Sequence, residues 1–127
     1  MEKDFARWNE RKRLLDAGPV TKHPQSREIW WCSLGLNIGI ETDGKHDAFE
    51  RPVIIIKTYN RASVLILPIT SVPKNDAFHF KLRTEIGDMY AKLTQIRAIS
   101  TKRILRKACR IDRHQFRALK KAIKENI

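Results

Sequence analysis

Residues 50–71, "ERPVIIIKTYNRASVLILPITS", decide the fold of this chain. They contain two apolar runs rich in β-branched residues, "PVIIIKTY" and "SVLILPITS", separated by "NRA". Short runs of this kind around a turn predict a β-hairpin whose two strands are both well buried. Packing explains only the apolar letters, so Arg51 before the first run and Thr70 near the end of the second need a separate reason.

The prolines of this stretch give both residues a defined place. A residue before proline is held in an extended conformation, and Pro52 is tolerated where a strand begins, so we expect Arg51 at the mouth of a strand. Pro68 cannot donate a ladder hydrogen bond, so it predicts an edge or bend that turns Thr70 out of the sheet. Two neighbouring strand ends can converge, which would bring Arg51 and Thr70 together.

The N-terminal segment predicts an amphipathic helix over residues 3–17. Phe5, Trp8 and Leu15 fall on one face at helical spacing, and Gly18 with the following proline ends the pattern. The polar linker "TKHPQS" follows. We expect the aromatic residues of this helix to pack on the rest of the chain or on a partner subunit.

The remaining segments predict further strands and two C-terminal helices. "EIWWCSLGL" is typical of a first strand, "NIGIETDGKHDAFE" of a loop, and "AFHFKL" and "MYAKLTQIRAI" of two more strands. Ser100 or Thr101 can cap a helix over residues 102–109. Asp112 can cap a second helix, whose apolar stripe is Phe116, Leu119 and Ile123.

Together these elements predict a mainly β fold with helices, a small antiparallel barrel. A closed sheet is expected because only closure hides the edges of so small a sheet. We divide the chain into an N-terminal helical extension and linker, residues 1–26, and a barrel domain with the C-terminal helices, residues 27–127.

The composition narrows the class of protein. No apolar run reaches the roughly 18 residues that a membrane span needs, and the charged N-terminus does not resemble a signal peptide, so we expect a cytoplasmic location and no membrane partner. Cys32 and Cys109 form no CxxC motif and have no histidine pair nearby. Neither a disulfide scaffold nor a zinc site is therefore expected, and both thiols are interpreted as small buried hydrophobes.

The net charge of +12 on 127 residues indicates an anionic partner, because such an excess attracts polyanions. Residues 100–127 carry ten basic and two acidic residues, so this segment alone holds +8 of that charge. A lysine-rich helix often has only a solvated face of this kind. Nucleic-acid binding is the interpretation we favour.

Six segments resemble one known family in order and spacing: "REIWWCSLG", "GIE", "RPVIII", "LPITS", "HFKL" and "LTQIRAIS". The chain resembles the MazF/PemK/Kid toxins, in which a GDIW-like strand precedes GSEQ, RPVLVI, PITS and QIRTI segments and a C-terminal helix. Each motif alone is weak, but their joint order is specific. The resemblance covers about residues 27–125, nearly the whole chain except the N-terminal helix, which has no counterpart in the compact toxins.

The resemblance implies an SH3-like barrel, a homodimer and an endoribonuclease that cleaves single-stranded RNA, such as mRNA, at short sequences. No metal and no other cofactor takes part in that family's reaction. The ribose 2′-OH attacks the adjacent phosphate and leaves a 2′,3′-cyclic phosphate and a 5′-OH. An acidic antitoxin that occupies the RNA groove keeps such a toxin inactive.

In one group of these toxins the catalytic pair is the arginine of RPV and the threonine of PITS, here Arg51 and Thr70. A guanidinium can donate two hydrogen bonds to the scissile phosphate and stabilise its extra negative charge, while the threonine hydroxyl adds a donor. Arginine keeps its charge at physiological pH, so we expect an electrostatic clamp ahead of proton donation to the leaving 5′-oxygen. Without the resemblance, a surface ion-pair residue and a turn residue are the alternatives.

Further candidates for RNA binding are Glu41, Lys45, Ser71, His79, Gln95 and Arg97. Glu41 matches the family's loop glutamate and can act as a base or contact RNA, or simply pair with Arg51. His79 can titrate near neutrality or be structural. Gln95 and Arg97 match the QxR motif, which implies a place in the groove or dimer interface, although strand alternation explains them equally well.

The sequence departs from the family at three points. Other members have a histidine before the loop glutamate and an aspartate before QxR, where this chain has Ile40 and Thr94, so that second catalytic set is absent. The loop "TDGKHDAFE" is also longer than usual. Because this loop often covers the substrate groove, the recognised RNA sequence can differ.

Two other functions stay open. One is a non-catalytic nucleic-acid-binding module of the same fold that uses its basic tail. The other is a protein poison, since a toxin of this fold blocks gyrase. The presence of both Arg51 and Thr70 favours the nuclease over the module, and the basic tail disfavours the poison, whose recognition uses a different C-terminal end.

Overall fold

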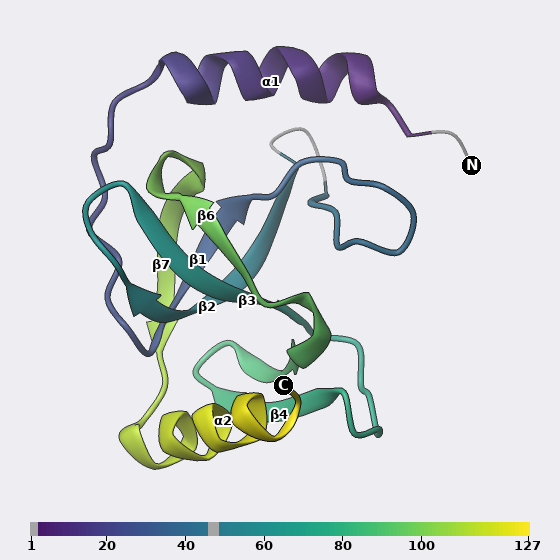
Figure 1. The fold of residues 1–127 in the computed structure, drawn as a ribbon, viewed down its shortest axis with the longest axis vertical. Coiled ribbons are helices and arrows are strands. Elements are labelled where there is room, and N and C mark those ends of the chain that lie inside the picture. The colour runs from purple at the N-terminus through teal and green to yellow at the C-terminus, as the bar shows by residue number, and fades with distance from the viewer. Residues whose placement is uncertain (1–2, 46–48) are drawn as a thin grey trace.

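The computed structural model describes residues 3–45 and 49–127, which form two α-helices, seven strands and two short 3₁₀ helices (Figure 1). The predicted loop over residues 37–50 contains residues 46–48, which lie outside the described part. In chain order the elements are α1 (Phe5–Ala17), β1 (Glu28–Ser33), β2 (Glu50–Thr58), β3 (Ser63–Thr70), β4 (His79–Thr84), β5 (Gly87–Lys92), η1 (Leu93–Gln95), β6 (Arg97–Ser100), η2 (Thr101–Arg103), β7 (Ile104–Arg110) and α2 (Arg113–Glu125).

The predicted hairpin is confirmed as β2 and β3. Ile54 pairs with Leu67 and Ile55 with Ile66, and all four side chains are fully buried. Successive strand residues point to opposite faces, so Ile54 and Leu67 join one core cluster while Ile55 and Ile66 join a second. Asn60 closes the turn by accepting two backbone hydrogen bonds. The unbroken apolar runs therefore reflect a sheet that is covered on both faces.

The fold is mainly β, with an antiparallel sheet and a helix at each end of the chain, but the sheet does not close. The strand order is β4-β5-β3-β2-β1-β7, and β6 pairs with β3. The predicted closure is wrong because each end of this order is protected in another way. Gln115 of α2 binds the backbone N–H and carbonyl of Arg83 in β4, and Arg106 and Lys107 place charges on β7, which discourage further strand pairing.

Pro68 lies where β3 changes partners. Residues Ser63–Ile66 pair with β6, whereas Ile69 and Thr70 pair with β5. The proline falls between these two groups, where its missing N–H costs no ladder hydrogen bond on that side. The prediction that Thr70 turns out of the sheet is wrong, because Thr70 is the last residue of β3 and pairs with Tyr90.

Two predictions for the C-terminal third are also wrong. The expected strand "MYAKLTQIRAI" is interrupted by η1 and divides into β5 and β6. The expected helix over residues 102–109 is only the turn η2, although Ser100 does cap it by accepting from the N–H of Lys102. Residues Ile104–Arg110 instead form β7, because pairing with the open side of β1 outweighs local helical preference.

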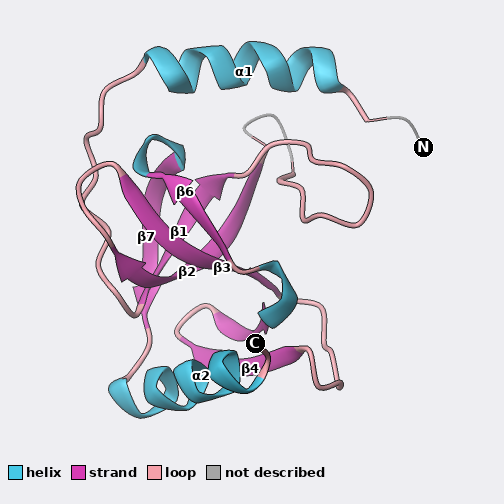
Figure 2. Cartoon of the chain, in the orientation of Figure 1, coloured by secondary structure: helices cyan, strands magenta, loops and turns pink. Residues whose placement is uncertain are grey.

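The C-terminal helix forms as predicted. Asp112 caps α2 by accepting from the N–H of Gln115, and Phe116, Leu119 and Ile123 are buried against the sheet. Figure 2 shows α2 beside β4 at one end of the strands and α1 at the other.

The N-terminal helix α1 packs on the rest of the chain mainly through Trp8, while its Asp16 carbonyl accepts a hydrogen bond from Lys102 Nζ at 2.7 Å. Trp8 is buried, and its ring lies 5.4 Å from that of Phe49, measured between centroids. Gly35, at φ 75°, leaves room for the indole, because a Cβ there would lie 2.0 Å from a Trp8 ring carbon. Contact of Trp8 with the rest of the chain is thus confirmed, whereas Phe5 is about half exposed in the single chain, and its packing on a partner subunit stays a prediction.

Both cysteines are free and buried, as predicted. Burial raises the pKa of the Cys32 thiol to about 12, so this thiol stays protonated at neutral pH. No helix within residues 3–45 and 49–127 is long and apolar enough to cross a membrane. The division of the chain at residues 26 and 27 stays a prediction.

Candidate active site

Arg51 and Thr70 line one hollow of about 340 Å³, which we call the Arg51 hollow. Arg51 stands at the start of β2 and Thr70 at the end of β3. The antiparallel pairing of β2 with β3 ends at Val53 opposite Pro68, and Arg51 and Thr70 each lie two residues beyond that pair. The hollow is lined by Trp31, Lys45, Glu50, Arg51, Pro52, Ile69, Thr70, Ser71, Val72, Ile86 and Met89.

Among the described residues, one hydrogen bond holds the Arg51 side chain. Its Nε donates to the backbone carbonyl of Asp43 at 2.8 Å. Burial lowers the pKa of Arg51, and the negative charge of Asp43 opposes that shift. No hydrogen bond joins the terminal Nη groups to a described residue. With respect to the described residues, the two outer nitrogens of the guanidinium can donate to a bound anion, and its orientation is set by Asp43.

The Thr70 hydroxyl is oriented as a donor. Thr70 is only 9% exposed, and its Oγ1 accepts a hydrogen bond from the N–H of Val72 at 3.2 Å. A hydroxyl has one proton besides its acceptor lone pairs, and that proton is left for another partner. Ser71 and Lys45, two of the predicted RNA-binding residues, are exposed and line the same hollow.

Lys92 adds positive charge beside the hollow. Burial lowers the pKa of Lys92, and the charges of Arg51, Lys74 and Lys45 lower it further, while Asp43 opposes them. Its Nζ lies 3.4 Å from Thr42 Oγ1. Lys92 and these three cations repel one another, and this concentration of positive charge favours binding of an anionic ligand beside the Arg51 hollow.

The lining contains one carboxylate, Glu50, and it faces another partner. Glu50 makes two hydrogen bonds to the guanidinium of Arg106, at 2.7 and 2.9 Å. The same guanidinium lies over the ring of Trp31, 4.9 Å from its centroid. Among the described residues, no three His, Cys, Asp or Glu side chains gather as metal ligands.

Three other predicted residues, Glu41, Gln95 and Arg97, line a separate hollow of about 690 Å³. Ile40 and Thr94, where other relatives place a second catalytic set, line it too. We call it the loop hollow; its remaining lining residues are Asn37, Thr42, Pro68 and Ile96. It reaches β3 at Pro68, and the next residue, Ile69, lines the Arg51 hollow.

Two of these side chains have partners within the chain. Gln95 Oε1 accepts from the N–H of Thr42 at 3.3 Å, which ties η1 to the long loop. Glu41 Oε1 accepts from the N–H of Ile38 at 3.0 Å. No ion pair joins Glu41 to Arg51 within the described residues, so the suggested pairing is wrong: Arg51 binds the Asp43 carbonyl instead.

His79 lies apart from both hollows. At the start of β4 its Nδ1 is 2.8 Å from Asp76 Oδ1. The hydrogen bond from His79 lowers the pKa of Asp76. This contact orders the turn before β4, as expected of a structural histidine.

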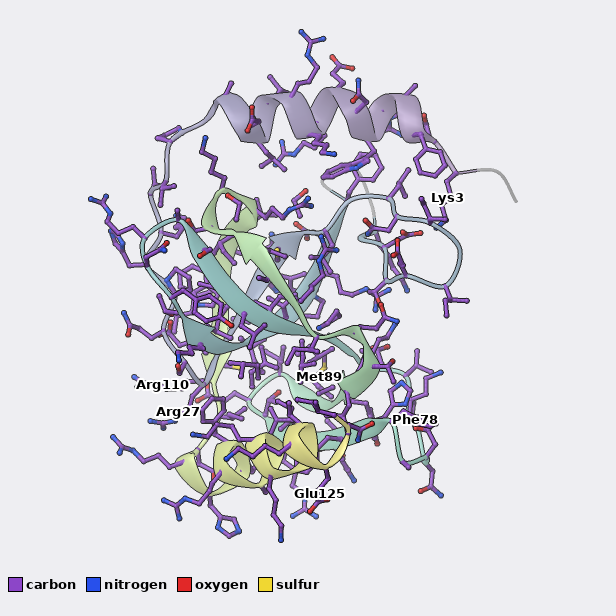
Figure 3. The ribbon with its side chains drawn as sticks, viewed as in Figure 1. Lys3, Arg27, Phe78, Met89, Arg110 and Glu125 are labelled. Atoms are coloured by element: carbon purple, nitrogen blue, oxygen red, sulfur yellow. The ribbon has the colours of Figure 1, made fainter. Side chains whose placement is uncertain are left out.

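The segment before helix α1 is linked to Arg51 through Asp43. Lys3 Nζ lies 2.9 Å from Asp43 Oδ2 and 2.6 Å from the carbonyl oxygen of Asn37 (Figure 3). Asp43 Oδ1 accepts from the N–H of Asn37 at 2.6 Å, and its carbonyl holds Arg51. The segment before α1 thus braces the loop residue that positions the arginine.

Sequence reasoning did not identify Lys92 or Asp43. The alternation in "MYAKL" places Met89, Ala91 and Leu93 in the core and Lys92 on the other face, which was a usable signal. Asp43 holds Arg51 through its backbone carbonyl, a contact that the residue type does not reveal.

The fold of this chain matches solved toxin structures over most of its length. MazF from Deinococcus radiodurans superposes with a TM-score of 0.70 at 16% identity, covering 84% of this chain and 97% of that one. A mycobacterial endoribonuclease in complex with its cognate antitoxin gives 0.63 at 12% identity, with 81% and 93% coverage. The Mycobacterium tuberculosis toxin MazF-mt6 gives 0.59 at 18%, with 78% and 94% coverage.

The sequence itself carries the family signal. Residues 25–127 match the family described as PemK-like, MazF-like toxin of type II toxin-antitoxin system, so the chain belongs to that family. The resemblance inferred from its motifs is confirmed. Among curated proteins, no sequence matches this one with significance.

Proposed function

We propose that this chain is an endoribonuclease that cleaves single-stranded RNA, including mRNA, by attack of a ribose 2′-OH on the adjacent phosphate. The observation that carries the proposal is the placement of Arg51 and Thr70 on one hollow, surrounded by positive charge. In this reaction negative charge builds up on the phosphate oxygens. Fixed donors aimed at those oxygens are the usual means of lowering such a barrier.

Each residue has a role that follows from its geometry. Arg51, anchored by its Nε, offers its outer nitrogens to two phosphate oxygens and stabilises the transition state as a clamp. Thr70 donates a hydrogen bond from its hydroxyl to the same phosphate. As the 2′-oxygen bonds to phosphorus and the bond to the 5′-oxygen breaks, the 2′-OH proton passes to solvent and the 5′-oxygen takes a proton from solvent. Lys45, Ser71 and Lys92 hold the neighbouring backbone, because the first two line the hollow and the third adds charge beside it.

The proposed path of the RNA continues into the loop hollow. Pro68 lines that hollow and the next residue, Ile69, lines the other, so an RNA strand that passes around the end of β3 would touch both. Glu41 and Arg97 would then contact bases or phosphates next to the cleaved bond, with Gln95 in the wall. His79 lines neither hollow and has no part in the proposed mechanism.

Membership in this toxin family supports two proposed partners. One is an acidic antitoxin, since a mycobacterial endoribonuclease of the same fold forms a complex with its cognate antitoxin. The other is a second copy of the chain in a homodimer. A cytoplasmic location, where mRNA is available, fits the same proposal.

Both other functions that the sequence left open make a distinct prediction. A binding module would retain RNA without cutting it, and a gyrase poison would act without touching RNA. Arg51, held in one orientation on the same hollow as a donor hydroxyl, favours cleavage. Binding of the RNA backbone alone requires positive charge but no fixed orientation of the donors.

The test is incubation of the protein with a long defined single-stranded RNA in EDTA, with every new end mapped. We expect recurrent cuts that leave 5′-OH and 2′,3′-cyclic phosphate ends. Replacing the ribose 2′-OH at a cleaved nucleotide by hydrogen should abolish that cut alone. Uncut RNA, or 5′-phosphate ends, would overturn the proposal.

A further inference from the structure

A second basic hollow, of about 460 Å³, lies near the start of α2. Its charged lining is Arg27, Arg110, Arg113, Arg117 and Lys120, and its apolar side chain is Phe116. We call it the α2 hollow. Figure 3 shows Arg27 and Arg110 close to one another beside the first turn of that helix.

This hollow is separate from the Arg51 hollow. In the sheet Arg110 pairs with Glu28, whereas Arg51 pairs with Cys32. These two β1 residues are four positions apart, so about 13 Å of strand separates the two basic regions at roughly 3.3 Å per residue.

The charges of the α2 hollow are not balanced within the described chain. Arg113, Arg117 and Lys120 fall on one helix face at i, i+4 and i+7, where like charges destabilise a helix. Arg113 is also the first residue of α2, where a cation opposes the helix dipole. No carboxylate lines the hollow, and none of its five cations has an ion pair to a described residue.

Neighbouring cations on β7 differ in this respect. Arg106 is paired with Glu50, and Lys107 with Glu28 at 2.7 Å. The chain thus neutralises the cations between the two hollows and leaves those of the α2 hollow to an external anion.

Arg27 is held in an unfavourable backbone conformation. Its φ is 76°, in the left-handed region that costs a residue with a Cβ roughly 1–2 kcal/mol. Its N–H donates to the carbonyl of Ile55 at 3.0 Å, and its carbonyl accepts from Ile111 at 2.9 Å. Its Nε donates to the Ile111 carbonyl at 3.2 Å. The surroundings therefore impose this conformation, which fixes a guanidinium at the hollow, as strained residues at binding sites often are.

We propose that the α2 hollow binds the phosphate backbone of single-stranded RNA outside the cleaved position. The identity of this polyanion rests on the proposed function. Four of the five cations are arginines, whose planar forks match phosphate oxygens. An acidic protein would need apolar anchors as well, but Phe116 is only 7% exposed.

The test compares Arg113→Gln/Arg117→Gln with Lys121→Gln/Lys124→Gln. Both variants remove two charges from α2, but Lys121 and Lys124 are exposed and do not line the hollow. Removing Arg113 also relieves the dipole conflict, so the first variant is expected to melt no earlier than the wild type by circular dichroism. The probes are a short and a long oligonucleotide with 2′-O-methyl groups, which cannot be cleaved by 2′-OH attack.

We expect the arginine variant to bind the long probe more weakly than the wild type does. The slope of log affinity against log salt concentration should also be shallower by about 1 to 1.5, because each of the two lost phosphate contacts contributes roughly 0.7 to that slope. The short probe and the lysine variant should behave like the wild type. Equal losses in both variants, or none in either, would overturn the proposal. Poly-glutamate that binds as tightly as RNA, with the same loss, would assign the hollow to an acidic protein instead.

Cleavage of unmodified RNA is measured beside binding. If the wild type cleaves RNA while the arginine variant binds the long probe normally, the proposal that the α2 hollow binds RNA is overturned and the proposed function stands. If the wild type does not cleave but the arginine variant loses binding, the proposed function fails and the α2 hollow stands.

Discussion

Replacing Trp8 by alanine should release α1 and weaken catalysis together. Trp8 is the only buried residue described in α1 and is 6% exposed. A tryptophan buries about 150–250 Å², which at about 25 cal/mol per Å² corresponds to about 4–6 kcal/mol. Truncation of a buried tryptophan to alanine usually costs about 3–5 kcal/mol. Once α1 has detached, the substitution can cost no more, so the loss in unfolding free energy is limited by the free energy with which α1 docks. We therefore expect a loss of about 2–4 kcal/mol.

The assay is urea unfolding together with hydrogen exchange of the α1 amides. The unfolding free energy should fall, and the amides of residues 5–17 should lose protection while those of β2 and β3 keep theirs. Leu14→Ala is the matched control, since Leu14 lies on the same helix and is 63% exposed. It should change stability by less than about 0.5 kcal/mol.

The detachment of α1 should also lower the cleavage rate, because a continuous series of contacts links Trp8 to Arg51. Trp8 packs on Phe49 and Gly35, at the two ends of the loop that carries Asp43, and Asp43 holds Arg51. The cleavage rate of Trp8→Ala should therefore drop while that of Leu14→Ala does not. A Trp8→Ala protein with protected α1 amides, or with a stability loss below about 1 kcal/mol, would refute this account of α1.

For three further substitutions the structure predicts the direction of the effect. Gly35→Ala should destabilise by at least about 1–2 kcal/mol from its backbone alone, and the clash of its Cβ with Trp8 should free α1 as well, both measured as above. Lys92→Met should raise the urea midpoint and weaken RNA binding, because the lowered pKa of Lys92 shows that its charge is disfavoured in the folded state; a lower midpoint with unchanged binding would contradict this. Burial raises the pKa of Glu28, but hydrogen bonds from Lys107, the Gln25 N–H and Trp30 together outweigh it, so the pKa lies below its ordinary value. Its stabilisation is thus present above the unfolded-state pKa and lost as pH falls through the folded-state value, so wild-type stability should decline more steeply in acid than that of Glu28→Gln.

Local patterns were sufficient for the hairpin, α2 and the placement of Arg51 and Thr70 at strand ends. The β-branched runs, the proline positions and the Asp112 cap each act within a few residues, so the sequence shows them directly. Segment 104–110 could not be read this way, because it is a strand only through its pairing with β1. The local sequence preference of that segment favoured a helix instead.

The site was predictable only in part for the same reason. Lys92 joins Arg51 because β5 pairs with the end of β3, and Glu41 is directed to Ile38 by the path of its loop. The proximity of Lys92 to Arg51 depends on a tertiary contact, of which the alternation in the sequence shows only the face of the strand. The bond of Glu41 is local, but it depends on the conformation of an irregular loop, which the sequence does not predict. The α2 hollow is intermediate: its stripe of cations was visible in the sequence, whereas the contribution of Arg27 was not.

The central claim is that Arg51 and Thr70 stabilise one transition state. Its most direct test is single-turnover cleavage at saturating RNA by Arg51→Lys, Thr70→Val and the double variant, with RNA affinity measured separately. We predict that Arg51→Lys loses about 10²-fold or more in rate with nearly unchanged affinity, and that the double variant loses less than the product of the single losses. Wild-type rates in Arg51→Lys and Thr70→Val, in protein that still binds RNA, would contradict the claim.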